Sequence, residues 1–460
     1  MENFWDSSVW GIVNLVTILL LSLLVANLLK KTVKVLQRSL IPTSVLGGLI
    51  LLVVAGIYRS ITGRLMFDEP FFGGKGMATM EVITYHMLAL GFIASTLRSS
   101  EAKLTKKRTE EIFNTGVTTV ATYLLQAFVG LGITMVAAVV MKEFFAAAGV
   151  LLPFGYGQGT GQALNYGTIY ENDFGFVGGK SFGLTIAALG FLSASIGGVI
   201  HLNVLKRQRK IESRQLGEKK LYENQIQMED EIPMNGSMDK LTVQIAIICG
   251  SYLIAYVLMY VLGNLLPGMK SVIYGFNFLL GVLGASLVKL MLRLLKHAGI
   301  VKKRYINDFL MNRVSNACFD LMVVSGIAAI RLDVLADYWA IILILGVVGL
   351  VITYIYNLVI ARTLFKEYAE EQFLAMYGML TGTASTGVIL LRELDEDFKT
   401  PVSDNLVYQN FPAIVFGFPL MLLATMAPKQ PGLTLLILMA FFAVMNVILF
   451  RTLIFKGKKK

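Results

Sequence analysis

The chain has 460 residues, of which 55% are hydrophobic and 15% are charged, and its mean hydropathy is +0.67. This balance lies outside the range of soluble globular domains and predicts a protein embedded in a membrane. The net charge of +11 would also fit a nucleic-acid-binding protein. In a membrane protein, however, an excess of Lys and Arg reflects the cytoplasmic loops, so we expect no nucleic-acid partner.

The reactive residues exclude several other classes. Cys249 and Cys318 both fall in predicted helices, and the three histidines are dispersed, so we expect neither a disulfide framework nor a metal site. The sequence has no P-loop, HExxH or GxSxG motif, so we expect neither an enzyme nor a bound cofactor. The first residues, MENFWDSS, lack a basic region and a cleavage site, which argues against a removable signal peptide.

Hydrophobic runs of about 20 residues predict about eleven transmembrane helices. In chain order the expected spans are residues 9–29, 41–58, 77–97, 115–141, 177–204, 240–265, 270–295, 308–330, 337–364, 402–426 and 432–455.

Basic residues predict the orientation, because short loops rich in Lys and Arg stay in the cytoplasm. Lys30 and Lys31 follow the first span, Arg98 follows the third, and the sequence ends in KGKKK. All basic loops lie on one side only if residues 155–161 and 381–387 enter and leave the membrane from the same side. We then expect the N-terminus outside and the C-terminus in the cytoplasm.

These two segments read GYGQGTG and TGTASTG, and each interrupts a series of apolar runs. With the orientation above, they predict an all-α membrane protein of 10–11 transmembrane helices, built from two inverted five-helix repeats with one re-entrant hairpin each. The expected parts are an N-terminal repeat, 1–204, with a hairpin near 145–168; a solvated cytoplasmic linker, 205–239; a C-terminal repeat, 240–426, with a hairpin near 370–392; and an additional C-terminal transmembrane helix with a basic tail, 427–460.

An irregular backbone at mid-membrane depth survives only where protein buries it or where it lines a wet cavity. Helix ends at such a hairpin tip offer N–H groups to an anion and carbonyl groups to a cation such as sodium. Close packing of small residues is the structural alternative. The expected substrate-binding residues are Gly157, Gln158, Gly159, Thr160, Gly161, Gln162, Thr383, Ala384, Ser385, Thr386, Gly387, Gln409 and Asn410.

Polar residues within spans suggest where an ion binds, because an ionisable group there is costly. Asn316 and Asp320 are one helical turn apart in the eighth span, and Thr381 begins the second glycine-rich segment. We expect these three residues to bind the coupling ion. For Asp320, an ion pair with Arg313 is the alternative.

Several motifs resemble the bacterial sodium/glutamate symporter family. They are IPTSVLGGLI at 41–50, HMLALGFIASTLRSS at 86–100, GYGQGTGQA at 155–163, SFGLTIAALGFLSASIGGVIHLNVLK at 181–206 and the segment 377–387.

The resemblance implies a sodium-coupled secondary active transporter that imports glutamate or a related small carboxylate across the bacterial cell membrane. It also implies a homodimer and an elevator-like movement of the domain that carries both hairpins. A proton-coupled carrier of another dicarboxylate or amino acid, and a gradient-independent channel or facilitator, remain as alternatives.

Overall fold

The structure is a computed structural model that describes residues 3–98, 105–141, 144–208, 231–233, 238–395 and 399–456. Within these ranges the chain is helical, and the one pairing of extended residues is an isolated bridge between Glu231 and Arg304. Most of the predicted linker and the last four residues of the basic tail lie outside the described residues.

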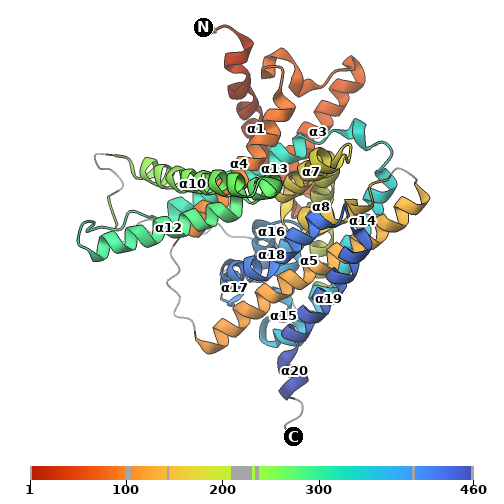
Figure 1. Ribbon diagram of the computed structural model, residues 1–460, viewed down its shortest axis with the longest axis vertical. Helices are drawn as coiled ribbons and strands as arrows, with labels where there is room; N and C mark the ends of the chain where they lie inside the picture. Colours follow the sequence, from red (N-terminus) through yellow and green to blue (C-terminus); the bar gives the residue numbers. More distant parts are fainter. Residues whose placement is uncertain are drawn as a thin grey trace. The chain divides into compact units, whose positions relative to one another are not determined.

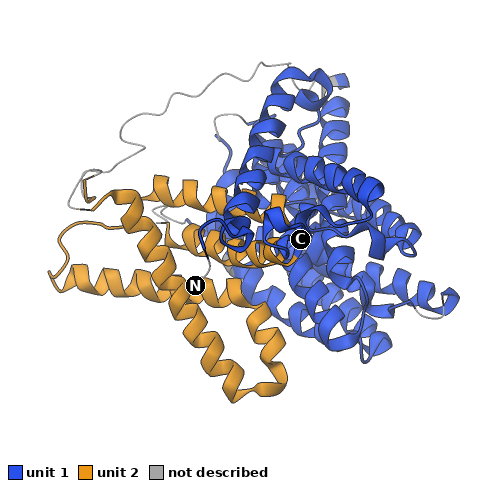
Figure 2. Ribbon diagram, turned by 90° about the horizontal axis from the view of Figure 1, so that it is seen from above, with its two compact units in different colours: residues 1–77, 104–215, 326–460 blue, residues 78–103, 216–325 orange. Residues whose placement is uncertain are grey.

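The helices form two compact units, coloured blue and orange in Figure 2. Unit 1 comprises residues 1–77, 104–215 and 326–460, and unit 2 comprises residues 78–103 and 216–325. Each unit takes segments from both halves of the sequence. The compact units are therefore a different division from the two predicted repeats, which stay a prediction.

Unit 1 contains both glycine-rich segments. Its helices are α1 (Ser7–Thr32), α2 (Lys34–Arg38), α3 (Thr43–Thr62), α5 (Lys106–Val140), α6 (Leu151–Tyr156), α7 (Gly159–Phe174), α8 (Gly179–Arg207), α14 (Trp339–Leu364), α15 (Ala369–Thr381), α16 (Ala384–Arg392), α17 (Val402–Tyr408), α18 (Asn410–Met426), α19 (Pro431–Leu449) and α20 (Arg451–Lys456). Helices α5 and α19 pack along each other (Figure 1), and the rings of Phe128 and Phe442 meet there with centroids 5.3 Å apart.

Unit 2 is built mainly from α10 (Lys240–Leu265), α11 (Lys270–Gly275), α12 (Asn277–His297) and most of α4 (Gly76–Leu97) and α13 (Asp308–Ala328). Helices α10 and α12 lie side by side (Figure 1). Its core contains Ile93 of α4, Ile248 of α10, Ala285 of α12 and Met311 of α13, all buried. All four long helices thus contribute apolar side chains to this core.

The number of apolar helices is smaller than predicted. Among the described residues, nine helices are long and apolar enough to cross a membrane, and α17 with α18 would make a tenth despite a 49° bend. The structure thus supports nine or ten of the 10–11 predicted transmembrane helices by length and apolar composition. The eighth expected span forms as α13, but polar residues such as Arg313, Asn316 and Asp320 lower its hydropathy and keep it out of this group.

Helix α5 is longer than its hydropathy predicted, because it starts at Lys106 rather than near residue 115. The Thr105 hydroxyl accepts a hydrogen bond from the Arg108 amide at 3.3 Å and caps the helix. One turn further, Arg108 forms an ion pair with Glu111 at 2.7 Å. The cap and the pair stabilise a polar first segment that hydropathy alone does not detect.

The end of the predicted linker is buried rather than solvated. The Glu231 carboxylate is 2.7 Å from the ammonium group of Lys240, and both side chains are almost fully buried. The amide of Asn307 donates to the same carboxylate oxygen at 2.7 Å. Because these contacts tie residue 231 to α10 and to the start of α13, the prediction of a solvated connector is wrong for this part of the linker.

Candidate functional site at two helix breaks

The first break separates α6 from α7 at residues Gly157 and Gln158. Gly157 is required because a Cβ atom there would lie 2.1 Å from the ring of Tyr123. Gly159 is required because its φ of +78° lies in the left-handed region, which other residues rarely adopt. The sequence GYGQGTG therefore ends one helix and starts another within three residues.

The second break separates α15 from α16 at Gly382 and Thr383. Thr383 has φ −141° and ψ 170°, an extended conformation that marks the residue before a helix. The Thr383 and Thr386 hydroxyls are 3.4 Å apart. Each glycine-rich segment is therefore a polar break between two helices, and the re-entrant course of the predicted hairpins stays a prediction.

The two breaks meet each other in unit 1. A Cβ atom at Gly159 would lie 3.3 Å from Cγ2 of Thr383 and 3.7 Å from the carbonyl oxygen of Gly382. Helices α7 and α16 both begin at this contact. Because the N-terminal turn of a helix has unpaired N–H groups and a positive dipole end, two such ends together form a region suited to an anion.

Helix α5 holds the breaks in place through three polar side chains. The Tyr123 hydroxyl donates to the carbonyl of Gly157 at 3.0 Å, and the Gln126 amide donates to the carbonyl of Leu380 at 2.9 Å. The Thr119 hydroxyl donates to Oε1 of Gln409 at 2.8 Å. Residues 119, 123 and 126 lie on one helix face, so a single rigid element fixes three irregular segments.

These three residues of α5 were not among the predicted site residues. Their signal in the sequence is the spacing i, i+4, i+7 of Thr119, Tyr123 and Gln126 within the fourth predicted span. Polar residues at that spacing mark a helix face that contacts protein rather than lipid.

Gln162 of α7 is the predicted site residue with the clearest need for a ligand. Its side chain is 2% exposed, and among the described residues neither Nε2 nor Oε1 has a hydrogen-bond partner. A buried amide without partners is destabilising by about 1–3 kcal/mol. Gln162 therefore offers one donor and one acceptor, one turn from the contact between the breaks.

The other residues of the first break differ in how far they are buried. Gln158 is half-buried, whereas Thr160 and Gly161 are buried. Thr160 packs against Gly326, where a Cβ atom would lie 2.7 Å from the threonine Cβ. This contact fixes the first turn of α7 by packing.

In the second break, Ala384 and Ser385 are exposed, whereas Thr386 and Gly387 are buried. A Cβ atom at Gly387 would lie 2.4 Å from the carbonyl oxygen of Ala375, so this glycine allows α15 and α16 to touch. The exposed hydroxyl of Ser385 and the half-buried hydroxyl of Thr383 are thus the more accessible groups of this tip.

Gln409 and Asn410 lie at the bend between α17 and α18. Besides its bond with Thr119, Gln409 has its Nε2 at 3.2 Å from the sulfur of Met379, in the last turn of α15. The structure therefore brings Gln409 next to the second break.

The three predicted ion ligands are divided between the units. Thr381 belongs to unit 1, where its buried hydroxyl donates to the carbonyl of Tyr377 at 2.6 Å. Asn316 and Asp320 belong to unit 2 and are exposed on α13. The guanidinium of Arg313 stacks over the ring of Phe309 at 5.0 Å.

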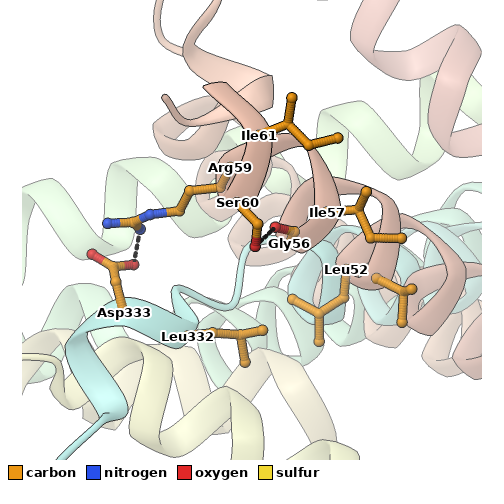
Figure 3. A pocket seen from close by; sticks show the side chains of 9 residues that line it. Leu52, Gly56, Ile57, Arg59, Ser60, Ile61, Leu332 and Asp333 are labelled. Atoms are coloured by element: carbon orange, nitrogen blue, oxygen red, sulfur yellow. Dashed lines mark hydrogen bonds and ion pairs between the residues drawn. The ribbon is translucent and has the colours of Figure 1, made fainter. Parts of the chain in front are cut away.

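A groove of about 640 Å³ lies elsewhere in unit 1, between α3 and the short helix η5 (Leu332–Leu335), as Figure 3 shows. Its walls are mainly apolar side chains such as Ile57 and Leu332, next to the ion pair of Arg59 and Asp333. None of the predicted site residues lines this groove. We therefore place the candidate site at the helix breaks.

A scan of protein families matches residues 10–400 to the model described as sodium/glutamate symporter. The match covers most of the chain and includes both helix breaks. The chain belongs to the sodium/glutamate symporter family. No curated protein sequence matches it significantly. The family is one of transporters rather than enzymes, and with its many apolar helices the chain is a multi-pass membrane protein.

Proposed function

We propose that this member of the family is a sodium-coupled symporter that imports glutamate or a related small carboxylate across the bacterial cytoplasmic membrane. The observation that carries the proposal is the contact between Gly159 and Thr383, where α7 and α16 both begin. Two helix N-termini favour a carboxylate, because their N–H groups and dipoles stabilise negative charge without adding a buried cation.

In this proposal the substrate lies against the two breaks. The buried amide of Gln162 and the hydroxyls of Thr383 and Ser385 supply hydrogen bonds, and Gln409 lies beside the second break. The complete proposed binding set is Gly157, Gln158, Gly159, Thr160, Gly161, Gln162, Thr383, Ala384, Ser385, Thr386, Gly387, Gln409 and Asn410.

The proposed inverted repeats receive support from two short segments of similar sequence. Residues 122–126 read TYLLQ and residues 353–357 read TYIYN, so a threonine, a tyrosine and a side-chain amide recur at one spacing. The first lies in α5, which precedes the first hairpin, and the second lies in α14, which precedes the second hairpin. We propose that α5 and α14 are equivalent helices of two inverted repeats, with the N-terminus outside and the C-terminus in the cytoplasm.

The homodimer and the elevator-like movement are also part of the proposal, and both rest on family membership. For the coupling ion, the predicted candidates are Asn316 and Asp320 in unit 2 and, taken by itself, Thr381 in unit 1. Asp320 is the carboxylate among them that would carry a proton if the transporter used protons instead of sodium. Replacement by asparagine removes that possibility and separates the two kinds of coupling.

Uptake by the purified protein in proteoliposomes tests the proposed function. An inward sodium gradient should drive labelled glutamate, or another small dicarboxylate, above its external concentration. An equal potassium gradient should not, and a proton gradient imposed without sodium tests proton coupling. Uptake that only equilibrates the substrate would indicate a facilitator. Failure to move any small carboxylate under a sodium gradient would refute the proposal.

A further inference from the structure

The repeated segments TYLLQ and TYIYN face each other in unit 1. Nε2 of Gln126 donates to the hydroxyl of Thr353 at 2.8 Å, and Nδ2 of Asn357 lies 3.4 Å from the hydroxyl of Thr122. Asn357 also donates to the carbonyl of Thr353 at 2.9 Å. Each amide of one helix therefore faces a threonine of the other helix, and the backbone carbonyl of Thr353 joins the two side-chain pairs into one network.

This network is buried completely. Gln126, Thr122 and Thr353 are 0% exposed, and Asn357 is 1% exposed. Polar groups at that depth are normally all paired, because nothing else replaces the hydrogen bonds that water would have made.

Two oxygen atoms of the network remain unpaired. Within the described part of the chain, neither Oε1 of Gln126 nor Oδ1 of Asn357 has a hydrogen-bond partner. Both amides use their nitrogen atoms within the network, so it is the oxygen atoms that are left over. Two unpaired carbonyl oxygens in one buried network indicate a species that binds to oxygen.

The chemistry of the network selects a small monovalent cation. Its four side chains offer two amide oxygens and two hydroxyl oxygens, and none of the four carries a charge. Oxygen atoms are the ligands of hard cations, and sites for calcium or magnesium rely on carboxylates. A neutral set of oxygen atoms therefore fits sodium better than a divalent ion.

We infer that a sodium ion binds between α5 and α14, with Oε1 of Gln126 and Oδ1 of Asn357 as ligands and the hydroxyls of Thr122 and Thr353 beside them. The inference rests on the proposed sodium coupling and names one place where a sodium ion is held. This site is separate from the set of Asn316, Asp320 and Thr381.

The site is connected to the second helix break. Gln126 donates to the carbonyl of Leu380 in the last turn of α15, at 2.9 Å, and Thr383 follows three residues later. An ion that fixes the Gln126 amide therefore also fixes the end of α15 and the start of α16. Sodium binding would in this way order one half of the proposed substrate site before the substrate arrives.

Thermal unfolding of the purified full-length protein tests the inference without substrate. Sodium chloride is titrated against choline chloride at constant ionic strength, and the melting temperature is followed. Sodium should raise the melting temperature of the wild type, because an ion that binds only the folded state stabilises it. Asn357→Leu and Gln126→Leu should each raise the half-saturating sodium concentration by about tenfold or more, or abolish the response.

Thr434→Val is the matched control. The Thr434 hydroxyl of α19 is also buried and, among the described residues, has no hydrogen-bond partner, but it is not part of the network. This variant should keep the wild-type sodium response. Equal loss of the response in Thr434→Val would show a general effect of changing a buried polar residue and would overturn the inference.

Asn357→Asp covers the case in which the leucine variants do not fold. It keeps an oxygen atom at the same place and adds a negative charge, so it should lower the half-saturating sodium concentration severalfold. An unchanged concentration in this variant would overturn the site. The site would also be overturned if both leucine variants responded to sodium as the wild type does. That result is expected if a water molecule, rather than sodium, occupies the network. The proposed sodium coupling would still stand in that case. If sodium affects neither stability nor uptake of the wild type, the proposed coupling fails instead.

Discussion

Gly159 and Thr383 are direct neighbours in the fold although they belong to opposite halves of the sequence, with a Cβ position at Gly159 only 3.3 Å from Cγ2 of Thr383. Each residue marks the start of a helix, α7 or α16. The contact therefore brings two positive helix ends together inside one compact unit. A site made of backbone dipoles suits a transporter, because it stabilises an anion without a fixed cation that would hold the anion too tightly.

Gly159→Ala is expected to reduce uptake by about tenfold or more. The φ of +78° costs an alanine about 1–2 kcal/mol, and the added methyl group presses on Thr383. Gly175→Ala is the matched control, since Gly175 has φ +72° at the end of α7 and no described atom within 4 Å of a Cβ. It should lose similar thermal stability and retain uptake. Equal loss of uptake in both variants would show that backbone strain alone is responsible.

Gln162→Met should separate stability from function. Because the buried Gln162 amide has no partner among the described residues, its replacement by an apolar side chain of similar size should leave the melting temperature unchanged or raise it. The affinity for the substrate should nevertheless fall by about tenfold. Substrate-dependent thermal stabilisation measures both effects in one titration. Gln372→Met is the control for a buried amide that is already bonded, to Thr115 at 3.3 Å, and should be destabilising.

The two helix breaks could be predicted from the sequence because the signal is local. Glycines and hydroxyl residues interrupt apolar runs at 155–161 and 381–387, and both helix breaks occur there. The contact of Gly159 with Thr383 could not be predicted in this way. It depends on how α5 packs against both hairpins, and hydropathy reports that α5 is apolar without showing which face carries Tyr123 and Gln126.

The network between α5 and α14 shows a second limit of the sequence. The criterion that points to Asn316 and Asp320, the cost of a polar residue inside a span, treats each helix alone, and both residues stay predictions. The network of Gln126 and Asn357 needs two helices that are distant in the sequence, and each helix contributes one amide. Only the paired arrangement shows that two buried oxygens lack partners.

Tyr123→Phe tests whether α5 holds the first break. The variant keeps the ring that fills the space beside Gly157 and removes the hydroxyl that donates to the Gly157 carbonyl at 3.0 Å. The loss should be about 0.5–1.5 kcal/mol of stability, together with slower uptake. Tyr85→Phe in unit 2 removes a comparable bond to the carbonyl of Tyr274 at 2.7 Å. Slower uptake in Tyr123→Phe alone would support the role of α5, whereas equal effects would contradict it.

Asp333 should make stability depend on pH in the acid range. Burial raises the pKa of its carboxyl group, but the ion pairs with Arg59 and Arg331 outweigh burial and hold the pKa below its ordinary value. The pKa of this carboxyl group is thus lower in the folded state than in the unfolded state. The ionised carboxylate therefore stabilises the fold above about pH 4, where an unfolded aspartate is also ionised. This stabilisation is lost as the pH falls through the folded-state pKa. Asp333→Asn should therefore lower the melting temperature at neutral pH. The loss should be about 1 kcal/mol or less, because the side chains of Arg59, Arg331 and Asp333 are partly exposed to solvent. The difference between variant and wild type should shrink steadily below about pH 4, and a difference that stays constant through that range would contradict the assignment of the ion pairs.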